Sequence, residues 1–314
     1  MKFLVILICL VVNHLRSDDC DRLDDSWFFR LRRLTDQALS RFERKRKLPW
    51  LVPVISIYAF LLLALFITLH FVSDVLYGFA TMLIHIWVLL VALDRTQPRK
   101  LASAFLVRWR DGDFRASLHF LQEEGLIAEG LAFKSDAQVF IHFKEQFIYR
   151  CFEKIFVMLF SYLLAGAFGV LFAYVSYQLR YSYKESQHAK REKLIDGIIL
   201  ALEWIPVRLL ALTFSLVGNF VLCFDKLRPQ LLDFSQRSSS ADLYVYATCA
   251  LSQVAGSGLN IGEPRPIKLD LISKGSDRVI QEGEIEALQA LLERSQTIWL
   301  AGLALVTLVG LQAF

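Results

Sequence analysis

The chain has 314 residues, 55% of them hydrophobic, and a mean hydropathy of +0.43, which excludes an ordinary soluble protein. Its net charge of +4 is too small to indicate nucleic-acid binding. Five cysteines without a C-x-x-C pair, and histidines without ligand spacing, argue against a disulfide framework or a zinc site. We predict no catalytic residue, no metal and no cofactor.

An apolar run opens the chain, MKFLVILICLVV over residues 1–12. Asn13 and His14 follow it, and no small-x-small cleavage site is present, so we predict a retained membrane anchor over 1–15 rather than a removed signal peptide. Twelve helical residues extend only about 18 Å, which is short for a complete crossing.

A basic segment follows over residues 16–49. Apolar residues recur in it at helical spacing: Trp27, Leu31, Leu34 and Ala38. Arginines surround them, and Arg44–Lys47 is a run of four basic residues. The pattern predicts a basic amphipathic helix, either lying on an anionic membrane surface or solvated and packed on the protein's own core.

The strongest signal is a pair of charge-free runs, Trp50–Val72 and Val75–Leu93. Each is long enough to cross about 30 Å of hydrocarbon. Only Ser73 and Asp74 separate them, so the runs must be antiparallel and form a transmembrane hairpin. His85 lies in the middle of the second run, where it is either functional or hydrogen-bonded to a neighbouring helix.

Residues 155–224 are apolar but irregular, with Gly166, Gly169 and Pro206 inside them. Pro206 predicts a break in the helix. A single crossing at 155–178 would also leave the basic residues of 180–193 outside, against the positive-inside rule. We therefore expect re-entrant or interfacial helices in this segment.

The predicted fold class is all-α, a polytopic helical membrane protein whose basic segments lie in the cytoplasm. In chain order the expected parts are an anchor (1–15), a basic amphipathic segment (16–49), the hairpin (50–93), a cytoplasmic helical segment (94–154), re-entrant or membrane-embedded helices (155–224), a cytoplasmic segment (225–296) and a terminal transmembrane helix (297–314).

Three charged residues inside 194–224 form the candidate site: Asp196, Glu203 and Arg208. The two acids are seven residues apart and share one helical face. Arg208 follows the expected break at Pro206 and can turn back toward Glu203. One interpretation is a small polar pocket for an anionic or nucleotide-like ligand. The other is a structural ion pair that closes a kinked helix.

The residues Glu203-Trp204-Ile205-Pro206-Val207-Arg208-Leu209 closely resemble the W-[VI]-P-V-R-L signature of the AmpE family. The N-terminal apolar run, the hairpin, Trp109–Asp113, the Gly166 segment and the terminal span fall in AmpE order, so the resemblance covers nearly the whole chain. It implies a bacterial inner-membrane regulatory or sensory protein associated with β-lactamase induction and cell-wall-linked signalling. It also marks Trp204 and Pro206 as motif residues.

The same motif is similar to the W-I-P-A-R-L stretch of the CobD/CbiB proteins, which implies an ATP-dependent amide synthetase as the alternative. That family has paired aspartates where this chain has Ile199 and Leu200, and acid is also missing at Gln178–Arg180. A synthetase needs carboxylates to hold magnesium, so AmpE is the better match. A structural scaffold is a third hypothesis. The expected partners are the lipid bilayer and a protein or small anionic ligand.

Overall fold

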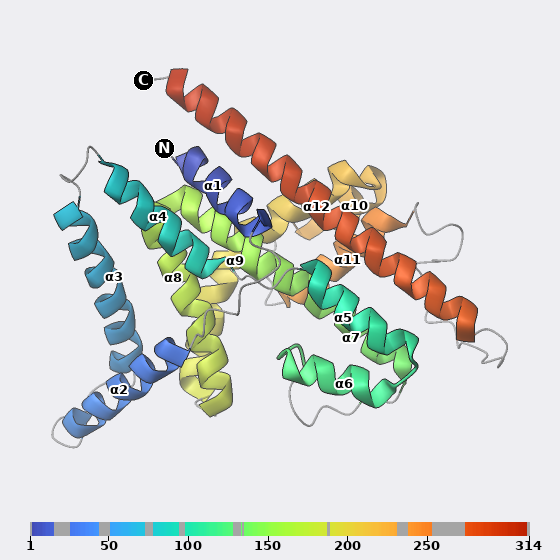
Figure 1. The fold of residues 1–314 in the computed structure, drawn as a ribbon, viewed down its shortest axis with the longest axis horizontal. Helices are drawn as coiled ribbons and strands as arrows, with labels where there is room; N and C mark the ends of the chain where they lie inside the picture. The colour runs from blue at the N-terminus through green and yellow to red at the C-terminus, as the bar shows by residue number, and fades with distance from the viewer. Residues whose placement is uncertain are drawn as a thin grey trace. The chain divides into compact units, whose positions relative to one another are not determined.

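All regular structure in the described part of the computed structural model is helical, which confirms the all-α prediction (Figure 1). The structure describes residues 2–15, 26–43, 51–72, 78–93, 98–127, 133, 135–186, 189–230, 238–252 and 274–312. By its internal contacts the chain divides into two units, Met1–Arg95 with Lys154–Pro206, and Thr96–Glu153 with Val207–Phe314.

Helix α8 is the centre of the first unit. The helices of this unit are α1 (Lys2–Leu15), α2 (Ser26–Glu43), α3 (Val52–Val72), α4 (Phe79–Ala92), α8 (Met158–Ser186) and the first part of α9 (Ala189–Val217). Helices α1, α3 and α4 all contact α8, and α2 packs on α3. Their shared core holds large side chains with almost no exposed surface, among them Ile6, Ile57 and Tyr162.

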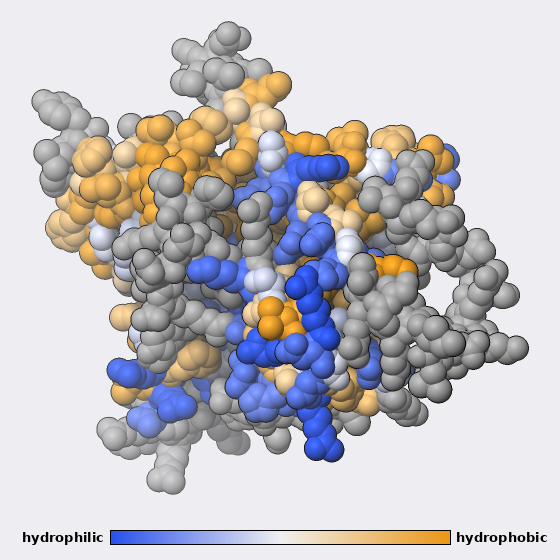
Figure 2. Space-filling view, turned by 45° about the vertical axis from the view of Figure 1, so that its right-hand side comes forward, coloured by the Kyte–Doolittle hydropathy of each residue, from blue (hydrophilic) through white to orange (hydrophobic). Residues whose placement is uncertain are grey.

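The two apolar runs form helices α3 and α4, as the sequence predicts. The second helix is shorter than its run because it begins at Phe79, after Gly78 in the left-handed conformation (φ 83°). The predicted turn at Ser73–Asp74 lies outside the described residues. Large apolar side chains of α3 stay exposed within the unit, including Phe60 and Phe71. In Figure 2 such apolar surface forms continuous orange areas, typical of a face that meets lipid.

Within the described residues, three helical stretches are long and apolar enough to cross a membrane: Val52–Val72, Asp136–Tyr183 and Lys190–Val217. The second contains α7 (Asp136–Cys151), a π-helical turn (Phe152–Val157) and most of α8. By length, the helices over 155–224 can therefore cross completely. Their predicted re-entrant or interfacial placement remains a prediction.

The helical break lies at Gly166, one of the glycines that made broken backbone plausible in this segment, and the break predicted at Pro206 is wrong. Ala165 and Gly166 have non-helical backbone angles inside α8, and Gly166 has φ 61° and ψ −143°, a region open almost only to glycine. Helix α9 continues through Pro206. A proline removes one backbone donor, and long helices bend around that loss without ending.

The second unit begins with short capped helices. Its helices are α5 (Pro98–Arg110), α6 (Phe114–Glu123), α7, α10 (Phe220–Leu227), the 3₁₀ turn η3 (Arg228–Gln230), α11 (Ser239–Leu251) and α12 (Lys274–Gln312). Asp113 caps α6 by accepting a hydrogen bond from the Ala116 N–H at 3.0 Å, and Ser135 caps α7 in the same way. Phe105 stacks on Phe143 with ring centroids 3.8 Å apart, so α5 and α7 share an aromatic core.

Helix α12 is longer than the sequence predicts. The predicted terminal span, 297–314, is the end of a helix that already starts at Lys274. Its first turns are polar and contact other helices of the unit. The Trp109 Nε1–H of α5 donates to Gln281 Oε1 of α12 at 2.9 Å. Farther along, the Trp299 Nε1–H donates to Thr213 Oγ1 at 3.1 Å. A membrane crossing by its last part remains a prediction.

The cysteine of α11, Cys249, is a buried free thiol. Burial raises its pKa above the ordinary value, and nearby Lys226 opposes that shift only in part. The thiol is therefore protonated near neutral pH and contributes as a small apolar core group rather than as a nucleophile.

Candidate functional site

Both predicted acids of α9 face α8, so their predicted common face is an interhelical one. Arg180 Nε and Asp196 Oδ1 form an ion pair at 3.1 Å, and both side chains are about half exposed. Ion pairs of this exposure contribute about 0–1 kcal/mol. This pair therefore links α8 to α9 but adds little stability.

The second acid, Glu203, is the buried centre of the site. Its side chain is 3% exposed, and the Tyr177 hydroxyl, itself 1% exposed, donates to Oε1 at 2.7 Å. A carboxyl group inside apolar helices is costly unless it is hydrogen-bonded, so the Tyr177 hydroxyl stabilises its placement. Tyr177 and Arg180 of α8 contact Glu203 and Asp196 of α9 in reverse chain order, as expected for antiparallel helices.

The amphipathic helix α2 joins the same stretch of α8. Arg32 donates to both the backbone carbonyl and the hydroxyl of Ser182, and its guanidinium lies 5.1 Å from the ring centroid of Tyr183. Trp27 stacks on Tyr174, with centroids 6.4 Å apart and ring planes 12° from parallel. We call the residues Arg32, Tyr177, Arg180, Ser182, Asp196 and Glu203 the polar cluster.

The opposite face of α2 stays available. Arg30, Arg33 and Leu34 are exposed within the unit, whereas Phe28 is fully buried. One face thus packs on the protein's own core, as one of the two interpretations expects. The basic and apolar outer face has the composition that the membrane-surface interpretation requires.

The remaining motif residues occupy the middle of α9. Trp204 is half-buried and Pro206 is buried inside the helix. Arg208 is half-exposed and belongs to the second unit. Because the helix is not broken at Pro206, the structure gives no turn that brings Arg208 back. Its place in a pocket with Glu203 remains a prediction.

His85 lies against the break in α8. Its Nδ1 is 3.1 Å from the Tyr162 hydroxyl, and the Cβ of any residue replacing Gly166 would lie 3.5 Å from His85 Cε1. This histidine therefore contacts a neighbouring helix, as the second of its two interpretations expects.

The sequence did not indicate Arg32, Tyr177 or Ser182 as site residues. A signal was present, because α8 carries serines and tyrosines at helical spacing in an otherwise apolar segment. That periodicity shows a polar face without showing which helix covers it. Among the described residues, no group of three or more histidines, cysteines or acids is placed to hold a metal ion.

Long apolar helices, exposed apolar surface and a buried polar pair between two candidate spans define a helical membrane protein. The model of one family matches residues 20–243, more than half of the chain, and its description is regulatory signalling modulator protein AmpE. The chain belongs to the AmpE family. No curated protein and no solved structure matches it. The relationship to CobD/CbiB proteins remains a prediction.

Proposed function

We propose that this AmpE-family chain is a multi-pass protein of the bacterial inner membrane that modulates β-lactamase induction in response to the state of the cell wall. The family match over residues 20–243 supports the regulatory role. The positive-inside rule supports an orientation in which the basic segments, including 16–49, lie in the cytoplasm.

The observation that carries the proposal is the buried hydrogen bond between Tyr177 and Glu203. Two apolar side chains would hold the same helices together without the cost of desolvating a carboxyl group. An ionisable group kept in such a segment points to a function. We infer that the polar cluster is the part of the protein that responds to a signal.

The signal that fits the cluster is a small anionic ligand or an acidic segment of a protein partner. Arg180 and Arg32 present guanidinium groups on α8 and α2. Arg208 is the arginine of the motif on α9, and we propose it as a further anion-binding residue. Guanidinium groups bind carboxylates and phosphates through paired N–H donors. An anion at Arg180 would compete with Asp196 for the same donors and so change the contact between α8 and α9.

The test is complementation of a strain that lacks the gene. Wild-type protein is expected to restore the ratio of β-lactamase activity measured with and without a subinhibitory β-lactam. Arg208→Gln is expected to reach the membrane at wild-type abundance and to leave that ratio near the value of the deletion strain. Lys193→Gln, an exposed change on the same helix, should behave as wild type.

Two results would contradict the proposal. One is a deletion strain whose induction ratio equals that of its parent. The other is an Arg208→Gln protein whose folded yield and function fall together, since that outcome assigns Arg208 a purely structural role.

A further inference from the structure

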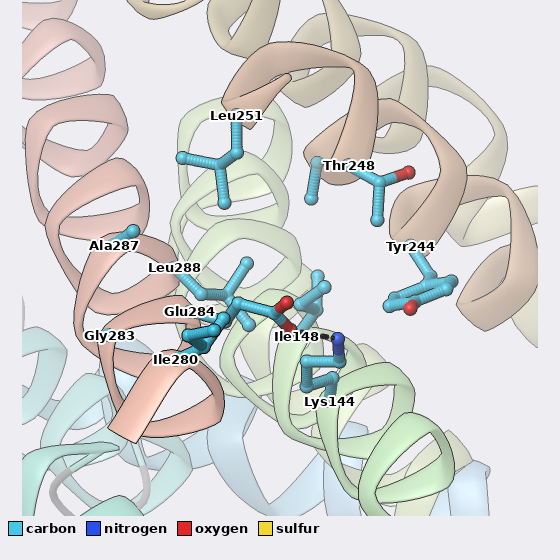
Figure 3. Close-up of a pocket in the computed structure, with 11 residues that line it drawn as sticks. Lys144, Ile148, Tyr244, Thr248, Leu251, Ile280, Gly283, Glu284, Ala287 and Leu288 are labelled. Atoms are coloured by element: carbon cyan, nitrogen blue, oxygen red, sulfur yellow. Dashed lines mark hydrogen bonds and ion pairs between the residues drawn. The ribbon is translucent and has the colours of Figure 1, made fainter. Parts of the chain in front are cut away.

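A groove of about 280 Å³ lies within the second unit, between α7, α11 and α12 (Figure 3). Most of its wall is apolar, formed by side chains such as Ile148, Leu251 and Leu288. Lys144 and Glu284 lie together at one end and Leu251 lies at the other. An apolar pocket with a few convergent polar groups is the usual form of a small-molecule site.

The polar end of the groove is rigidly built. Lys144 Nζ donates to Glu284 Oε2 at 2.6 Å, and the lysine side chain is only 13% exposed. The ammonium group also lies 4.8 Å from the Phe140 ring centroid and 5.7 Å from that of Tyr244. An ammonium group has three N–H donors. The carboxylate of Glu284 uses one, so a ligand oxygen that enters the groove meets a donor already fixed in position.

The size of the groove limits the occupant. A helix of a protein partner is about 10–12 Å wide and does not fit such a volume. A pocket for a drug-sized molecule measures about 300–1,000 Å³. The groove, at about 280 Å³, is at the small end of this range. It therefore takes one alkyl chain and not the two of a phospholipid. Since the chain is a membrane protein, lipid-derived molecules with one alkyl chain are available to it.

We propose that this groove binds one long-chain fatty acid. The alkyl chain lies along Ile148 and Leu288 toward Leu251, and the carboxylate accepts a hydrogen bond from Lys144. This site lies wholly in the second unit, shares no residue with the polar cluster, and stands independently of the proposed signalling role.

Gly283 gives a direct way to close the groove. It lines the cavity, and a Cβ built on it meets no heavy atom within 4 Å. There is therefore space for a side chain to begin at this position, and Gly283→Phe places a ring at the groove. Replacing a helical glycine does not weaken the helix. Gly302 on the same helix is equally open and lies outside the groove, so Gly302→Phe is the matched control.

The experiment uses full-length protein in lipid nanodiscs and palmitic acid that carries a photoreactive diazirine. Label is expected on peptides of α7, α11 and α12. Gly283→Phe should reduce it at least about ten-fold, equivalent to 1.4 kcal/mol of binding, while Gly302→Phe leaves it unchanged. Both variants should elute as monodisperse protein. Equal labelling of the two variants, or label confined to other helices, would overturn the proposal.

A second arm tests the role of Lys144. The fatty alcohol with the same photoreactive chain should label the wild type about ten-fold less than the acid, the effect of one charge-assisted hydrogen bond. Lys144→Met with Glu284→Leu removes both charges and leaves no unpaired partner, so it should label equally with acid and alcohol. Two results would contradict a fatty-acid site. One is equal labelling of the wild type by the acid and the alcohol. The other is labelling of the groove by a diacyl phospholipid probe that Gly283→Phe abolishes.

Discussion

Gly166→Ala is expected to lower the free energy of unfolding by about 1–3 kcal/mol, the cost of holding a non-glycine residue in a forbidden backbone region. Gly166 has φ 61° and ψ −143° inside α8. Its new methyl group would meet His85 Cε1 at 3.5 Å, an ordinary contact, so backbone strain rather than crowding causes the loss. Denaturant unfolding in detergent micelles, followed by tryptophan fluorescence, measures it.

Gly197→Ala is the control for this change. Gly197 is an exposed residue in the middle of α9, and a Cβ there meets nothing within 4 Å. In an exposed helix interior, alanine is more stable than glycine by about 1 kcal/mol. The two substitutions should therefore change stability in opposite directions. A Gly166→Ala protein as stable as the wild type would show that α8 is not broken at this residue.

Tyr177→Phe should cost about 1–3 kcal/mol of stability, because it removes a buried donor from the Glu203 carboxyl group. A double-mutant cycle with Glu203→Met isolates the interaction from the change in packing. We expect the double variant to lose about 1–3 kcal/mol less stability than the sum of the losses of the two single variants. Additive losses, within about 0.5 kcal/mol, would mean that the two side chains do not interact.

Much of the fold follows from local patterns in the sequence. Charge-free runs of spanning length predicted α3 and, with a shorter extent, α4. Helical spacing of apolar residues predicted α2, and the spacing of the two acids predicted their common face on α9. These features depend on neighbours along the chain, so one sequence is enough to find them.

The parts that were not predicted depend on contacts between distant segments. A glycine in an apolar run is compatible with a straight helix, and the sequence does not show that Gly166 lies opposite His85 of α4 with non-helical backbone angles. Proline is a strong local signal, yet one missing donor did not end α9. Tyr177 and Arg32 became site residues because α9 and α2 cover the same part of α8, which periodicity alone does not reveal.

The measurement that tests the central claim most directly is β-lactamase induction by a Glu203→Gln strain. Glutamine keeps an oxygen that can accept from Tyr177 and removes only the ionisable group. Glu192→Gln on the same helix is the matched control. Membrane abundance, measured by immunoblot, should equal that of the wild type for both variants. We predict that Glu203→Gln shifts the induction ratio toward that of the deletion strain and that Glu192→Gln does not. A Glu203→Gln strain with wild-type abundance and wild-type induction would contradict a signalling role for the polar cluster.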